Sequence, residues 1–292
     1  IGRGMGILPP AMASRSSPSR LPSFRVPIAV FLGAIACWLT LSATQPPGPG
    51  LDPDSTQYVA AARSLATHGT LEVPDDSWDS PDSVEPLSHF PPGLSAVLAV
   101  PTALGADTIQ TARAVNALAA LAVMVIVFLL VSGSAGGTRW AGVIAAVATA
   151  VTPGVAYTFM DVLSEPLFLV LMAATLALMI RERERPWVAG IAAAGAAMVR
   201  YAGVALIAAV ALWYFLAPGT VRRRLRRAVA AGAPGAAAFG AWVIRTHLAT
   251  RGEGIRHFSV YSQIGPTLRA GVRTLTAWAA PLLSGGWASA AA

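Results

Sequence analysis

Charged residues, cysteine and lysine are the scarce components of this chain. Only 12% of its 292 residues are charged, against 55% that are hydrophobic, and the mean hydropathy of +0.60 excludes an ordinary soluble domain. Cys37 is the single cysteine, so a disulfide framework and a thiolate metal cluster are both excluded. All 21 basic residues are arginine. This pattern is typical of a coding bias, so the missing lysine carries no functional weight.

Long apolar runs take the place of charge. Several reach the ~20 residues that a helix needs to cross a bilayer. The arginines cluster in loops beside these runs, which is the positive-inside pattern of a membrane protein. The pI near 10.7 therefore does not indicate binding to nucleic acid. The sequence predicts an all-α fold: a polytopic transmembrane helical bundle whose outer-face loop carries short amphipathic juxtamembrane helices.

The charge pattern also divides the chain. Residues 1–25 are rich in Pro, Ser and Arg and predict a disordered basic tail. Because basic segments stay inside, we expect the N-terminus to lie in the cytoplasm. The expected location is a bacterial-type plasma (inner) membrane. Residues 26–292 are expected to form the transmembrane domain, with 51–105 as its first outer loop. The chain begins at Ile1 and stops in an apolar stretch, so we expect it to be the N-terminal part of a longer protein. The expected spans are 26–43, 112–131, 140–159, 163–180 and 228–248, with another beginning at Leu275.

The apolar segment 186–218 is flanked on both sides by arginine clusters, so it must cross the membrane an even number of times. Two helices of about 15 residues would each be about 22 Å long, which is short of a ~30 Å hydrocarbon core. Broken backbone at that depth is tolerated where it lines a cavity. The segment therefore predicts a short hairpin with Arg200 at the floor of an outward-facing cavity.

The first outer loop is the long polar part of the chain. Residues 51–93 hold eight of the fourteen carboxylates and a single arginine, Arg63. Residues 56–66 predict an amphipathic helix on the membrane surface that stops near Gly69. Asp54, three residues before Gln57, fits a helix cap, and Asp52 before Pro53 is a second candidate cap.

Two charges fall beside apolar spans, where charge is costly and functional by default. Glu165 favours a helix N-terminus electrostatically, with Pro166 in the first turn, or takes part in the chemistry. Arg200 requires an anion, which is either a phosphate or a carboxylate such as Glu165 in a structural ion pair.

These segments together resemble the GT-C superfamily of integral-membrane glycosyltransferases. Within it the chain is most similar to polyprenyl-phosphate-sugar users related to protein O-mannosyltransferases and lipid A aminoarabinose transferases. The resemblance rests on the order and placement of four motifs: Asp54-x-x-x-Tyr58, His89-Phe90-Pro91-Pro92-Gly93, Ser164-Glu165-Pro166-Leu167-Phe168 and Arg200-Tyr201-Ala202-Gly203.

The resemblance implies that Asp54 is the catalytic base. The protein mannosyltransferase branch has a glutamate where Ser55 stands, so the donor and acceptor of that branch are not carried over. The expected activity is inverting transfer of a sugar from a polyprenyl-phosphate carrier to a glycan, lipid or protein acceptor on the outer face. The expected catalytic residues are Asp54 and Glu165, and the expected substrate-binding residues are Asp52, Tyr58, Arg63, His89, Arg200, Tyr201 and Arg256.

No cofactor is expected, because the sequence has no His/Asp/Glu cluster at metal-ligand spacing. Two alternatives from other classes stay open. A secondary transporter would place its charges at mid-bilayer on broken helices in paired repeats, whereas these charges favour outer helix ends. A non-catalytic GT-C-like scaffold would keep the fold and lack the chemistry.

Overall fold

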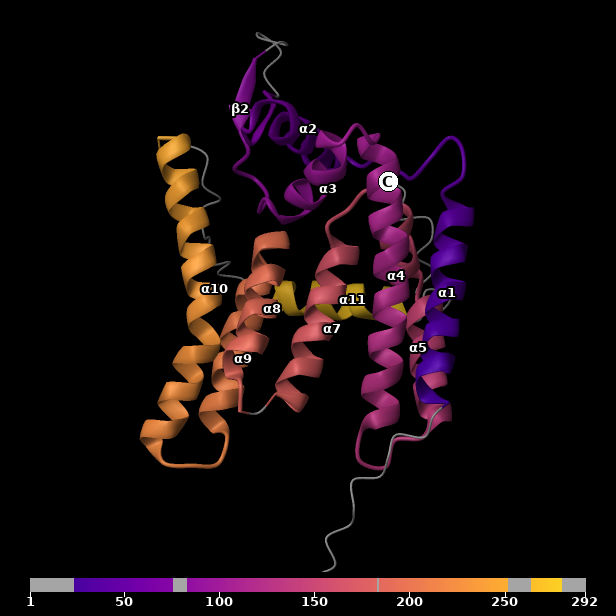
Figure 1. Ribbon diagram of the computed structural model, residues 1–292, viewed down its shortest axis with the longest axis vertical. Helices are drawn as coiled ribbons and strands as arrows, with labels where there is room; N and C mark the ends of the chain where they lie inside the picture. Colours follow the sequence, from indigo (N-terminus) through magenta and orange to yellow (C-terminus); the bar gives the residue numbers. More distant parts are fainter. Residues whose placement is uncertain (1–23, 76–82, 183, 252–263, 280–292) are drawn as a thin grey trace, which may run out of the picture.

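The computed structural model describes residues 24–75, 83–182, 184–251 and 264–279. Its long helices run roughly parallel in a bundle, the helix Ile264–Ala279 lies across them, and a small layer of short helices and strands covers one end (Figure 1). The described elements are α1 (Arg25–Ala43), α2 (Pro53–His68), β1 (Glu72–Pro74), β2 (Val84–Pro86), α3 (Gly93–Ala103), α4 (Thr108–Gly133), α5 (Arg139–Val151), α6 (Pro153–Met160), α7 (Glu165–Arg181), α8 (Pro186–Val199), α9 (Gly203–Leu216), α10 (Val221–Ala249) and α11 (Ile264–Ala279). The predicted all-α membrane bundle is confirmed.

Among the described residues, three helices, α1, α4 and α10, are each long and apolar enough to cross a membrane. The span expected over 140–159 is not continuous, because α5 and α6 meet at a bend of 63°. Pro153 lacks an N–H and disfavours helical geometry in the residue before it, so Thr152 takes an extended conformation with ψ 116°. The helix breaks there and continues in a new direction.

The predicted hairpin is present as α8 and α9, each of 14 residues. Small residues let α8 approach its neighbours closely, as is common between membrane helices. Ala189 and Ala193 are fully buried, and a Cβ on Gly190 would collide with the backbone carbonyl of Ala231 on α10. This close contact sets the position of α8 against α10, and the hairpin tip lies below the α2–α3 layer (Figure 1).

Helix α2 ends as predicted at Gly69, whose φ of 72° suits glycine. Its apolar stripe does not lie on the membrane surface, however. Tyr58 and Val59 are buried in a cluster with Leu94 and Leu98 of α3 and with residues of α4 and the α6–α7 turn. Protein rather than lipid covers this stripe. The sequence did not predict the antiparallel pairing of β1 with β2 in the same layer.

Two boundaries near the other end of the chain differ from expectation. Helix α10 begins at Val221 rather than near residue 228, so the second arginine cluster forms its first two turns. Leu275 does not begin a helix, because it lies within α11.

Candidate functional site

Arg200 lies where α8 ends and its backbone turns extended. Its Nη1 atom donates to Ser164 Oγ at 3.0 Å and lies 2.5 Å from Glu165 Oε1. The two charged side chains are 35% and 30% exposed, so the pair is not sealed in the core. The hairpin tip and the start of α7 are thus joined by an ion pair that remains partly open to its surroundings.

Tyr58 extends this contact to α2. Its hydroxyl lies 3.0 Å from Ser164 Oγ, and its ring packs against Phe90 with centroids 4.9 Å apart. The side chain is 1% exposed. Burial raises the pKa of Tyr58 to about 12, so the phenol stays neutral at physiological pH and serves as a hydrogen-bonding group. Three elements distant in sequence therefore converge on Ser164.

The Glu165–Arg200 pair leaves hydrogen-bonding capacity unused. Glu165 Oε2 is buried and has no partner among the described residues. Both contacts of Arg200 come from Nη1, and no hydrogen bond from Nε or Nη2 is found within the described part of the chain. The ion pair with Glu165, one of the two alternatives for Arg200, is therefore present, and Arg200 retains donors for a second anion.

The structure separates the two aspartates at the start of α2. Asp52 is the N-cap residue, and its backbone N–H donates to Ser55 Oγ at 2.9 Å. Asp54 follows in the first turn with an exposed side chain, so the capping interpretation belongs to Asp52 rather than Asp54. Asp54 and Tyr58 are four residues apart in α2, so they share one face of the helix.

Asp161, in the α6–α7 turn, was not among the expected site residues. It is only 7% exposed, and its Oδ2 has no partner among the described residues. Burial raises the pKa of its carboxyl group, a hydrogen bond with Tyr157 offsets part of that rise, and the neighbouring charge of Asp52 raises the pKa further. A partly desolvated carboxylate of this kind is typical of functional sites.

Backbone contacts hold Asp161 in place. Gly50 donates from N to Met160 O at 2.9 Å and accepts at O from Val162 N at 3.0 Å. A Cβ on Gly50 would overlap the Asp161 carboxylate. Asn116 Nδ2 donates to Asp161 O at 2.6 Å. Nothing near Asp161 in the sequence indicates its pairing with Gly50, which lies more than a hundred positions earlier in the chain.

The other expected site residues lie apart from this cluster. Tyr201 links the hairpin tip to the segment before α3, because its hydroxyl donates to Ser88 O at 3.0 Å. Arg63 turns to Thr108, with Nε 3.4 Å from Oγ1. His89 is exposed beside the ring of Phe90. Arg256 lies outside the described residues. Tyr58, Glu165 and Arg200 are therefore the expected residues that the fold gathers at Ser164 and the adjoining ion pair.

A metal site was also sought among the acidic and imidazole side chains. In the segments that the structure describes, no group of three or more His, Cys, Asp or Glu residues is placed to hold a metal ion.

The comparisons with known proteins bear on residues 89–248. Over this range, more than half of the chain, the sequence matches the family model described as dolichyl-phosphate-mannose-protein mannosyltransferase. Comparison with curated proteins and with solved structures gave no match. The matched range holds Asp161, Glu165 and Arg200 but begins after Asp54 and Tyr58. The predicted resemblance to GT-C glycosyltransferases is confirmed, and the chain belongs to the dolichyl-phosphate-mannose-protein mannosyltransferase family.

Proposed function

We propose that this glycosyltransferase moves a sugar, with inversion at its anomeric carbon, from a polyprenyl-phosphate carrier to an acceptor hydroxyl. Membership of the family supports a polyprenyl-phosphate-linked donor in general. The observation that carries the proposal is the position of Arg200. A partly exposed guanidinium at the recessed tip of a short hairpin, with donors unused, suits the phosphate of a lipid carrier.

Arg200 acts on the leaving group. As the bond between the anomeric carbon and the phosphate oxygen breaks, negative charge collects on the phosphate, and a guanidinium stabilises that charge with paired donors. Glu165 holds Nη1 in the resting state and thereby orients the guanidinium plane. Ser164 fixes the same nitrogen from a second side.

Asp54 acts on the acceptor. Its exposed carboxylate takes the proton from the acceptor hydroxyl while that oxygen bonds to the anomeric carbon on the face opposite the phosphate. Two observations support this role. The cap of α2 is supplied by Asp52, and Asp54 shares a face of α2 with Tyr58, whose hydroxyl reaches the Arg200 cluster through Ser164. The acceptor is a glycan, a lipid or a protein that enters beside α2.

The orientation is part of the proposal. The α2–α3 layer with the acidic loop faces the outside of a bacterial-type inner membrane, and the opposite end faces the cytoplasm together with the N-terminus. The arginines of the α7–α8 connection and of the first two turns of α10 support this orientation, because basic segments beside membrane spans are retained inside.

Substitution at Asp54 and Asp52 tests the proposed base. Asparagine caps a helix about as well as aspartate but cannot accept a proton. We expect Asp54→Asn to bind the lipid donor normally and to lose transfer by roughly 10²–10⁴-fold, the usual loss for a positioned base. Asp52→Asn, the matched control two residues away, should keep most of its activity. The measurement is release of labelled sugar from a polyprenyl-phosphate donor by the protein in membranes.

The opposite pattern would place the base at Asp52. Wild-type transfer by both variants would remove the base from this helix altogether. If the unaltered chain moves the labelled lipid across the membrane and transfers no sugar, the transporter interpretation replaces this one.

A further inference from the structure

The end of the bundle opposite the site carries a cleft of about 640 Å³ between the start of α8 and the first turns of α10. Glu184 and Trp187 line one wall, and Arg223, Arg226 and Arg227 line the other. The cleft shares no residue with the Arg200 cluster, so the proposed transfer reaction does not account for it.

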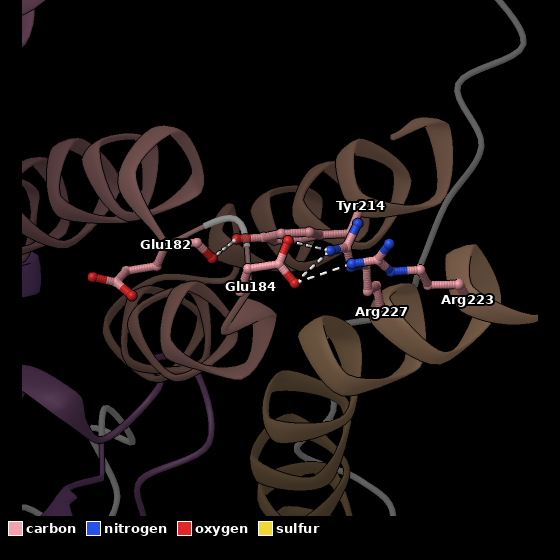
Figure 2. A network of polar contacts seen from close by, with 5 residues as sticks. All are labelled: Glu182, Glu184, Tyr214, Arg223 and Arg227. Carbon is pink, nitrogen blue, oxygen red and sulfur yellow. Dashed lines mark hydrogen bonds and ion pairs between the residues drawn. The ribbon is translucent and has the colours of Figure 1, made fainter. Parts of the chain in front are cut away.

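Glu184 neutralises part of this arginine wall. Its carboxylate lies 3.2 Å from Arg223 Nη2 and 2.6 and 2.7 Å from Arg227 Nη2 (Figure 2). Arg223 and Arg227 stand one helical turn apart, where like charges repel, and the carboxylate between them relieves that repulsion. The hydrogen bond from Arg227 holds the pKa of Glu184 below its ordinary value. One acidic charge is therefore fully engaged by two basic ones.

Arg226 keeps its charge free for a ligand. It is exposed and lines the cleft, and no acidic partner for it is found among the described residues. The carboxylate of Glu182 points away from the arginines in Figure 2, while its carbonyl accepts from the Tyr214 hydroxyl at 3.0 Å. Three arginines against one glutamate leave the cleft with two positive charges in excess.

Apolar side chains complete the cleft. Trp187, Leu225 and Val229 all line it and are 50%, 54% and 58% exposed. A small free anion would leave this apolar surface bare, whereas an amphiphile would cover it. Tryptophan beside basic residues at the end of membrane helices is typical of the level of lipid headgroups.

We propose that this cleft binds an anionic phospholipid of the surrounding leaflet. Its phosphate contacts Arg226 and the outer nitrogens of Arg223, and its acyl chains lie along Trp187, Leu225 and Val229. The site is separate from the transfer reaction and does not depend on it. If the arginines served only to orient the chain in the membrane, loss of an arginine at one position would affect lipid retention as much as loss at another. A binding site predicts a larger loss at the cleft, so the two explanations can be separated.

The test uses the full chain in nanodiscs that contain phosphatidylcholine and phosphatidylglycerol, with bound lipid counted by native mass spectrometry. We expect phosphatidylglycerol to be retained over phosphatidylcholine, and Arg226→Gln to weaken that retention about fivefold, the factor for one basic residue at an anionic lipid surface. Trp187→Ala should weaken it as well. The matched control is Arg139→Gln, which removes an exposed arginine beside an exposed tryptophan, Trp140, where α5 begins.

Several outcomes would overturn the proposal. Equal loss in Arg139→Gln and Arg226→Gln would show diffuse attraction rather than a site. Equal retention of the two phospholipids would remove the role of charge. Competition by inorganic phosphate at the affinity of the lipid would show that the apolar wall is unused, and stronger retention of polyprenyl phosphate would assign the cleft to the carrier.

Discussion

A single oxygen, Ser164 Oγ, joins the three elements of the site. It accepts from Arg200 Nη1 and shares a hydrogen bond with the Tyr58 hydroxyl, both at 3.0 Å. Ser164 is fully buried, so the loss of either partner removes one of the two hydrogen bonds that this oxygen makes in the protein interior. The position of Arg200 is therefore set by contacts that do not require a substrate.

Arg200 itself can be tested by a graded series. We expect Arg200→Gln to fold and to bind a polyprenyl-phosphate donor roughly ten- to hundredfold more weakly, which corresponds to about 1.5–3 kcal/mol for a charged hydrogen bond. Arg200→Lys should recover only part of this loss, because a point charge cannot reproduce the planar fork. Binding of a fluorescent donor analogue to the purified protein measures the effect.

The ion pair with Glu165 provides the opposing outcome. Arg200→Gln leaves Glu165 as a partly buried carboxylate without its counter-charge. If Arg200→Gln abolishes stable expression and Glu165→Gln in the same chain restores it, with donor binding unchanged, then Arg200 has a structural role only.

The contribution of Asp161 to the free energy of unfolding should depend on pH. Its raised pKa means that the folded state holds the proton more tightly than the unfolded state, so its contribution favours folding at low pH and declines as pH rises through the folded pKa. We expect Asp161→Asn to raise the melting temperature at pH 7, by about 2–4 °C for each kcal/mol of penalty removed, and to gain less near pH 4. Thermal unfolding at the two pH values measures this difference, and a gain that is the same at both would contradict it.

At the scale of single residues, the placement of charge in the sequence explains why Arg200 was predicted as a site residue and Asp161 was not. Arg200 stood out because a guanidinium in an apolar segment between basic clusters has few physical explanations. Asp161 lies in a turn, where an aspartate is ordinary. Its burial comes from the pairing of Gly50 with the chain around Asp161, which local sequence does not encode.

At the scale of elements, the α8–α9 hairpin depends on close backbone contact. A Cβ at position 190 meets the carbonyl of Ala231, which cannot rotate away as a side chain can. We expect Gly190→Ala to destabilise the protein by about 1–3 kcal/mol through overpacking. Gly240→Ala is the matched control, since Gly240 lies within α10 with nothing within 4 Å of an added Cβ, and it should be neutral or stabilising. Chemical denaturation in detergent gives both values, and equal effects would show that the contact is not tight.

The elements themselves were only partly predictable. The even number of crossings between two arginine clusters dictated the hairpin, whatever the packing around it. The α5–α6 bend was missed because hydropathy runs unbroken through Thr152 and Pro153, although proline marks a helix boundary. The burial of the α2 stripe was missed because an apolar face does not say whether lipid or protein will cover it.

At the scale of the whole molecule, the orientation in the membrane rests on the arginine distribution. Two exposed alanines, Ala106 and Ala135, flank α4 at its opposite ends. In a chain carrying Cys37→Ala, we expect Ala106→Cys to react with an impermeant thiol reagent added outside intact cells, and Ala135→Cys to react only after the membrane is opened. Mass shifts on gels report the labelling. The reverse pattern would invert the molecule and move the site to the cytoplasmic side.

The short hairpin has a consequence for the bilayer around the protein. At 1.5 Å per residue, the 14 residues of α9 span about 21 Å, and the hydrocarbon core is ~30 Å thick. Helices α4 and α10 are long enough for the full thickness, so we expect a hydrophobic mismatch of about 9 Å on the flank of the hairpin. We expect the membrane to be thinner there than elsewhere around the protein. For the proposed function, a thinner membrane at this flank lets a lipid phosphate reach the Arg200 guanidinium without entering the hydrocarbon.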